Sequence, residues 1–249
     1  MHEGPAIPKD FTVGVREFHT TRWSMVLKAG GEGEDAGSAL ERLCRSYWYP
    51  LYIFVRRRGH GADEAQDLTQ EFFARLLASE TIQSADPEKG RFRTFLLAAM
   101  KHHLINVWRD ANRQKRGGGR EIVSWDNLEA EERYQAESTT GEDEDSLFDR
   151  RWARAVVTAA LDRMRGEMEG EGEGERFAVL QEFLQGDAGE SYAGASQTLR
   201  LSESAVKSAI FRMRRRYGQY IREEIMQTVA DPDQVEEEIR HLISVIARG

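Results

Sequence analysis

The stretch that decides the fold is residues 92–116, FRTFLLAAMKHHLINVWRDANRQKR. Its apolar residues recur at helical spacing, which predicts one continuous amphipathic helix. These apolar positions are Phe92, Phe95, Leu96, Ala99, Leu104, Val107 and Trp108. The other face carries Arg91, Arg93, Lys101, His102, His103, Asn106, Arg109, Arg113, Lys115 and Arg116, with one acid, Asp110. In a chain of net charge −8, such a face suits a polyanion whose bases are also contacted. The alternative is a core helix with a solvated basic face, and this stretch alone leaves both open.

Composition limits the class of protein around this helix. The chain has 249 residues, of which 40% are hydrophobic and 31% charged, so it has room for one large or two small domains. No apolar run approaches the roughly 18 residues that a membrane span needs, and we expect no membrane insertion. The N-terminus lacks an apolar signal core, and Cys44 is the only cysteine. Both observations favour a cytoplasmic protein without an internal disulfide.

Further helical patterns surround the central helix and predict a bundle over residues 21–116, after a flexible N-terminus at residues 1–20. Residues 38–58 read as a helix that Pro50 should kink or split, ending in cations followed by Gly59. Asp63 should begin the next helix, which runs to Ala78 with acids in its first turn. This part of the chain is therefore predicted to hold three or four helices.

The bundle should end at three consecutive glycines, residues 117–119, where an acidic segment begins. Residues 117–147 combine low hydrophobicity with many carboxylates, which predicts a flexible acidic linker. The segment could be a solvated tether. It could also act as an acidic mimic of nucleic acid that occupies a basic channel in a partner.

A second helical domain is predicted over residues 148–228, and residues 191–216 within it have helix-turn-helix proportions. The first helix should end near Leu199 and Arg200, and Ser202 should cap the second. Buried packing is expected for Ala205, Val206, Ala209, Ile210 and Met213. Small polar residues in front of cations suit insertion into a major groove, although an exposed basic helix is the alternative. No acidic residue lies between Lys207 and Glu223 in the sequence. The cations of this stretch are Lys207, Arg212, Arg214, Arg215, Arg216 and Arg222.

A C-terminal extension is expected at residues 229–249, with a helix that begins near Pro232. Its apolar side would contain Val235, Ile239, Leu242 and Ile246. It could pack back on the second domain, mask that domain's DNA-reading face, or bind a partner. The sequence predicts, in sum, an all-α protein of two small helical domains joined by a flexible acidic linker.

Three motifs together resemble the extracytoplasmic-function (ECF) type sigma factors of bacterial RNA polymerase. Residues 65–76, AQDLTQEFFARL, resemble the family's polymerase-binding helix. Residues 92–96, FRTFL, resemble the start of its promoter-melting helix, although Phe95 stands where the family usually has Trp. Residues 201–208, LSESAVKS, resemble the turn and recognition helix of its upstream-element reader. The resemblance covers roughly residues 38–116 and 148–225, and the long acidic linker departs from it.

The resemblance implies a sigma factor that gives promoter recognition and DNA melting for transcription initiation. Docking on the clamp helices of core RNA polymerase would fall to Asp67, Gln70 and Glu71. The melted strand of the downstream promoter element would be held by Phe92, Phe95, Lys101, His102, His103, Asn106, Arg109 and Arg113. The upstream element would be read as duplex by Ser204, Lys207, Ser208, Phe211, Arg212 and Arg215. The promoter sequence, the inducing signal and any anti-sigma or other regulatory protein stay open.

Two other classes of protein are alternatives to a sigma factor. A stand-alone helix-turn-helix regulator with a helical partner-binding domain would need neither the residue 65–76 motif nor the aromatic and basic helix. An enzyme is not expected, because the sequence has no phosphate-binding glycine loop and no nucleophile paired with a base. We also expect no catalytic residues, no cofactor and no metal: His102 and His103 are adjacent and point in different directions on a helix.

Overall fold

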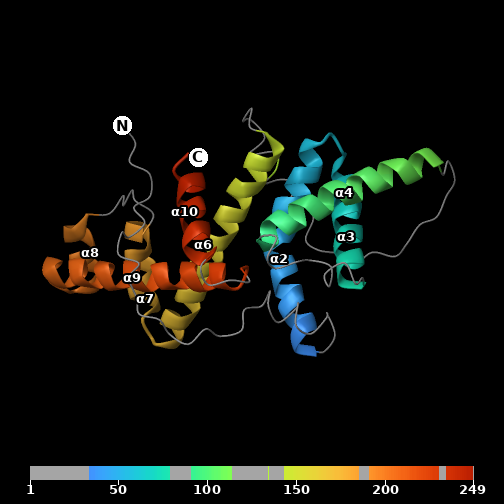
Figure 1. Ribbon diagram of the computed structural model, residues 1–249. Coiled ribbons are helices and arrows are strands. Elements are labelled where there is room, and N and C mark those ends of the chain that lie inside the picture. The colour runs from blue at the N-terminus through green and yellow to red at the C-terminus, as the bar shows by residue number, and fades with distance from the viewer. Residues whose placement is uncertain are drawn as a thin grey trace. The chain divides into compact units, whose positions relative to one another are not determined.

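A computed structural model gives the arrangement of the chain (Figure 1) and describes residues 34–78, 91–113, 134, 143–184, 191–229 and 234–248. For residues 34–45 and 110–113 only the backbone is described. The elements with defined bounds are eight α-helices and one short 3-10 helix, and the described residues contain no strand. The predicted all-α class is therefore confirmed. The expected N-terminal segment and most of the expected linker lie outside the described residues.

Contacts along the chain divide it into two compact units. The N-terminal unit holds the described residues from 34 to 152 together with 227–229, and the C-terminal unit holds those of 153–226 and 234–248. The division falls inside α6, Glu144–Gly170. The second domain was predicted to begin at residue 148, whereas Phe148 and Trp152 are buried and belong to the N-terminal unit.

Three helices form most of the N-terminal unit: α2, Glu34–Arg57; α3, Ala62–Ala78; and α4, Phe92–Arg113. Helix α2 runs through Pro50, so the split considered from the sequence does not occur. Gly59 follows the helix with φ of +90°, as expected of a C-terminal glycine. Asp63 and Glu64 lie in the first turn of α3, where the helix dipole favours acids.

Helix α4 is one continuous helix, as predicted, but its apolar stripe is narrower than the sequence indicated. Phe92, Leu96, Met100 and Leu104 are buried at intervals of four residues. Trp108 was expected on this face, yet it is 68% exposed. The C-terminal end of α4 extends past α3 in Figure 1. The assignment of Trp108 to the core is therefore wrong.

The start of α6 completes the core of the N-terminal unit. Leu147, Phe148 and Trp152 are buried there, and the Trp152 Nε1–H donates a hydrogen bond of 3.1 Å to the hydroxyl of Tyr47 on α2. The predicted flexible linker reached residue 147. The described structure shows instead that helix α6 has begun at Glu144, because apolar residues just behind the acids pack on α2 and α4.

The C-terminal unit contains the rest of α6 and a predicted helix-turn-helix pair. Its other elements are α7, Gly174–Leu180; the 3-10 helix η2, Gln181–Leu184; α8, Tyr192–Leu199; α9, Glu203–Met226; and α10, Gln234–Ile246. Arg200 takes the left-handed conformation, with φ of 53°, and ends α8. Ser202 accepts a hydrogen bond of 3.2 Å from the Ala205 N–H, which confirms it as the cap of α9.

Helix α10 packs against α9 through Val235, Ile239 and Leu242, all of which are buried. Arg222 on α9 also forms an ion pair with Glu236 on α10. This is the packing arrangement that we weighed from the sequence for the C-terminal extension. None of the described helices is long and apolar enough to span a membrane.

Candidate nucleic-acid interface

The three residues expected to bind polymerase lie on α3, in different surroundings. Asp67 is exposed. The carboxylate of Glu71 pairs with Arg75 at 2.7 Å, one turn further along the helix. Both polar atoms of the Gln70 amide are buried and have no hydrogen-bond partner. Asp67 therefore offers the most accessible of the three polar groups.

On α4, part of the expected DNA-binding set forms an exposed face. His102, Asn106 and Arg109 are exposed along successive turns of the helix. The structure adds two residues to this face, Ile105 at 43% exposure and Trp108 at 68%. Trp108 was missed because it fitted the apolar pattern of the core, and Ile105 was assigned to neither face of the helix. No signal in the sequence separates Trp108 from the core positions, because it continues the four-residue spacing after Leu104.

Two other members of the predicted set, Phe92 and His103, are buried and do not offer their side chains to solvent. Phe92 is fully buried, with its ring edge-on to Tyr47 at a centroid distance of 5.3 Å. His103 is 6% exposed and lies 5.9 Å from the ring of Phe72 on α3. Both face the neighbouring helices because they continue the apolar stripe of α4. Burial lowers the pKa of His103, which favours the neutral imidazole.

The other three members of the predicted DNA-binding set on α4 differ in their surroundings. Phe95 is half-buried and stacks beside Phe92 at a centroid distance of 6.3 Å. The ammonium group of Lys101 is engaged by Asp145 at 2.6 Å. The side chain of Arg113 lies outside the described residues.

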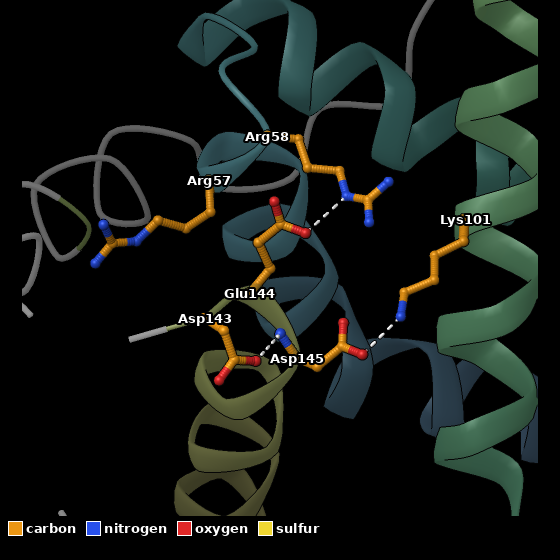
Figure 2. A pocket seen from close by; sticks show the side chains of 6 residues that line it. All are labelled: Arg57, Arg58, Lys101, Asp143, Glu144 and Asp145. Carbon is orange, nitrogen blue, oxygen red and sulfur yellow. Dashed lines mark hydrogen bonds and ion pairs between the residues drawn. The ribbon is translucent and has the colours of Figure 1, made fainter. Parts of the chain in front are cut away.

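A polar pocket of about 520 Å³ lies beside Lys101 in the N-terminal unit (Figure 2). Arg57, Arg58 and Lys101 line it from α2 and α4, and they face Asp143, Glu144 and Asp145 at the start of α6. Asp143 caps α6 by accepting hydrogen bonds from Ser146, and these lower the pKa of its carboxyl group. Sequence reasoning did not assign Arg57 and Arg58 to any site.

In the C-terminal unit, α9 presents the predicted reading face. Its members Ser204, Lys207, Ser208, Phe211, Arg212 and Arg215 are all exposed. Val206, Ala209, Ile210 and Met213 are buried on the opposite side, as predicted, while Ala205 is half-buried. The ammonium of Lys207 lies 5.2 Å from the ring centroid of Tyr192, the first residue of α8. The arrangement leaves polar, aromatic and cationic groups available on one side of a single helix.

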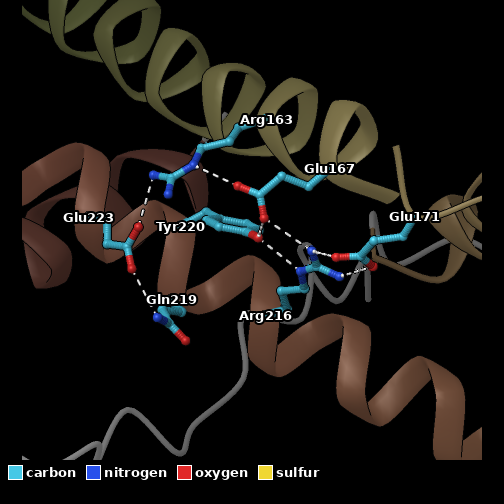
Figure 3. Close-up of polar contacts among 7 residues, drawn as sticks. All are labelled: Arg163, Glu167, Glu171, Arg216, Gln219, Tyr220 and Glu223. Carbon is cyan, nitrogen blue, oxygen red and sulfur yellow. Dashed lines mark hydrogen bonds and ion pairs between the residues drawn. The ribbon is translucent and has the colours of Figure 1, made fainter. Parts of the chain in front are cut away.

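The other cations of this segment have partners from other elements, which the absence of nearby acids in the sequence did not reveal. Arg214 donates to the carbonyl of Phe183 at 2.8 Å, and Arg222 pairs with α10. Arg216 pairs with Glu167 at 3.0 Å and Glu171 at 2.8 Å on α6, as Figure 3 shows. Hydrogen bonds to Glu171, Tyr220 and Glu167 raise the pKa of Arg216, and the largest contribution comes from Glu171.

The same network joins α6 to α9 through Tyr220. Its hydroxyl donates to the Glu167 carboxylate, and this bond lowers the pKa of Glu167 (Figure 3). Arg163 completes the network, because it pairs with Glu223 at 2.8 Å and with Glu167 at 3.2 Å. The cluster therefore fixes α9 in place and does not compete with the exposed reading face.

The fold and these surfaces define a helical protein with a helix-turn-helix unit and a second unit that carries an exposed basic and aromatic helix. Residues 43–114, which include most of α2 and all of α3 and α4, match the family model of sigma-70 region 2. The match supports a sigma factor of the sigma-70 family, with a role in promoter recognition by RNA polymerase. Core polymerase and promoter DNA are the partners that it implies.

Sigma factors are not enzymes, and the match points to a protein of that kind. No curated protein and no solved structure matches the chain significantly. Among the residues that the structure describes, no group of three or more His, Cys, Asp and Glu side chains could hold a metal ion.

Proposed function

We propose that this chain is an ECF-type sigma factor that binds core RNA polymerase in the cytoplasm and directs it to promoters. The N-terminal unit would dock on the core and hold the opened downstream element. The C-terminal unit would read the upstream element as duplex. The observation that carries the proposal is the region 2 match over α2–α4 in a chain whose second unit exposes a basic helix-turn-helix face.

The exposed face of α4 suits a separated strand better than an intact groove. Ile105 and Trp108 offer apolar surface on which an unstacked base can rest, and His102 and Asn106 offer hydrogen-bonding groups nearby. Stacking on an aromatic side chain contributes roughly 1–3 kcal/mol per base, which offsets the cost of unstacking. Melting would therefore need no covalent chemistry, and no cofactor is proposed.

The C-terminal unit suits duplex DNA. Ser204 and Ser208 lie near the N-terminal end of α9, where side chains can reach base edges, and Arg212 and Arg215 follow one and two turns later. Cations at those positions can contact phosphates on the groove wall. The proposal therefore assigns the reading of bases to the start of α9 and the phosphate contacts to its middle.

Reconstituted transcription tests this function. The full chain, core RNA polymerase and a library of genomic fragments are combined, and transcript start sites are mapped. We expect the chain to bind core and to produce defined start sites that share two spaced sequence elements. A chain that does not bind core, but binds duplex DNA tightly by itself, would instead be a stand-alone helix-turn-helix regulator.

A further inference from the structure

The basic end of α2 and Lys101 on α4 are covered by the acidic start of α6. The Nε–H of Arg58 donates to Glu144 at 3.0 Å, and the Lys101 ammonium donates to Asp145 at 2.6 Å (Figure 2). Arg57 lines the same pocket. Two carboxylates thus hold two cations, one just after the end of α2 and the other on α4.

The carboxylates of Glu144 and Asp145 offer these cations charged oxygens, as the phosphates of a nucleic-acid backbone would. Each supplies negatively charged oxygens at hydrogen-bonding distance, and guanidinium and ammonium groups bind phosphate oxygens in the same way. Lys101 also shares a helix face with Ile105 and Trp108, since the three are spaced four and three residues apart. A single DNA strand bound at Ile105 and Trp108 on the exposed face of α4 would therefore also reach Lys101.

The contacts at this site differ in strength along α6. The exposed fractions of the paired side chains are 31% and 39% for Arg58 and Glu144, and 33% and 52% for Lys101 and Asp145. Ion pairs this open to water contribute little to stability and are readily displaced. Arg93 and Asp149, one turn further along, are only 10% and 23% exposed and pair at 2.6 Å.

The start of α6 therefore has a largely buried ion pair at Asp149 and two exposed ion pairs at Glu144 and Asp145. The guanidinium of Arg93 also lies 4.9 Å from the ring centroid of Trp152, which is buried against α2. This attachment keeps the start of α6 beside the pocket when Glu144 and Asp145 release their cations. The effective concentration of the two carboxylates at the pocket is consequently high.

We propose that Arg58 and Lys101 form a phosphate-binding site for single-stranded promoter DNA, and that Glu144 and Asp145 occupy this site in the free chain. The acidic start of α6 then competes with DNA and weakens binding until a strand displaces it. This inference rests on the proposed function and extends it, because it adds Arg58 to the DNA path and names an intramolecular competitor.

The test compares the full chain with the double variant E144Q/D145N. Both are titrated into a fluorescein-labelled, unstructured DNA strand, and binding is followed by fluorescence anisotropy over a series of KCl concentrations. The control variant E169Q/E175Q removes two exposed carboxylates from the C-terminal unit and causes the same change in net charge. Circular dichroism and thermal unfolding check that each variant is folded.

We expect E144Q/D145N to bind the strand at least about threefold more tightly than the wild type, the gain that release of two exposed ion pairs allows. The slope of log affinity against log salt should also steepen, because salt weakens the acidic competitor of the wild type as well as its DNA contacts, and this offset is absent in the variant. Adding R58A to the double variant should reduce its slope by about 0.7, the contribution of one phosphate contact on a single strand. The control variant should bind as the wild type does.

Equal affinity and equal salt slope for wild type and E144Q/D145N would overturn the inference, and so would an equal gain in E169Q/E175Q. Binding to core polymerase is measured on the same samples. Failure of the wild type to bind core would count against the proposed function. Normal core binding without any gain in the double variant would count against the intramolecular competitor alone.

Discussion

At the scale of single residues, burial separates the side chains of α4 into two groups with different consequences. His103 is buried beside the ring of Phe72, and its Nε2 atom is buried without a hydrogen-bond partner. The neighbouring His102 is exposed. Folding therefore removes the side chain of His103 from water and leaves that of His102 exposed, so the two adjacent residues contribute differently to stability.

His103 should make stability depend on pH. Burial lowers its pKa in the folded chain below the ordinary value of 6.5, so the unfolded chain binds a proton first as the pH falls. The free energy of unfolding should therefore be highest above about pH 6.5 and decrease below it. Urea unfolding at about pH 7.5 and pH 5.5 measures this loss. H103Q should reduce the loss, whereas H102Q should behave as the wild type does.

Trp108 should act in promoter opening without supporting the fold. Because its side chain is 68% exposed, W108A should leave the thermal unfolding midpoint nearly unchanged. It should lower open-complex formation about tenfold, within the range for loss of one base–aromatic stack. Permanganate footprinting with core polymerase measures the opened region, and W108F serves as the control that keeps an aromatic ring. Equal footprints for W108A and wild type would exclude a stacking role.

At the scale of elements, a set of polar contacts joins α9 to α6. Tyr217 donates to the carbonyl of Val157 at 3.1 Å, and Glu167 receives hydrogen bonds from Tyr220, Arg216 and Arg163. Burial raises the pKa of Tyr217 to about 12, so its hydroxyl remains a donor at physiological pH. Helix α9 is therefore held from the side opposite its exposed polar and basic face.

Replacing Glu167 should loosen this attachment. The hydrogen bond from Tyr220 lowers the pKa of Glu167 in the folded chain, so the stability that the carboxylate contributes is present at neutral pH. It should be lost as the pH falls from the unfolded-state value towards the folded one. E167Q should lower the free energy of unfolding at pH 7 by about 1 kcal/mol or less, because the group is partly exposed.

Urea denaturation followed by circular dichroism, repeated at acidic pH, measures both effects of E167Q. E169Q is the matched control, since Glu169 is exposed on the same helix. If E167Q and E169Q unfolded at the same urea concentration at every pH, the network would have no role in stability.

At the scale of the whole molecule, the proposed tasks fall on separate units of one chain. Asp67, on α3, belongs to the N-terminal unit, and Arg212, on α9, belongs to the C-terminal unit. Both side chains are exposed, so their replacement should disturb contacts with partners more than the fold. Paired variants can therefore separate core binding from DNA reading.

D67A should weaken binding to core polymerase several-fold and leave duplex binding to the upstream element unchanged. R212A should do the reverse and should reduce the salt slope of duplex binding by about 0.9, the contribution of one phosphate contact. Surface-immobilised core measures the first interaction, and anisotropy with a labelled duplex measures the second. Each variant is the control for the other. Loss of both activities in either variant would indicate unfolding and contradict this division.

The sequence alone determined the helices and the order of the motifs. The periodicity of α4, the cap at Ser202, the glycine after α2 and the apolar side of α9 all depend on residues within a few positions of one another. Such local patterns need no knowledge of the packed chain. The family resemblance could be found for the same reason.

Only the tertiary structure decided which polar and aromatic groups remain available. Arg58 and Glu144 are 86 residues apart, and Arg216 and Glu171 are 45 apart, so no local pattern reveals that each cation meets an acid. Burial of His103 depends likewise on α3. Whether a side chain meets water, an acid or a ring depends on which helices pack together, because ion pairs and buried contacts form between segments distant in sequence.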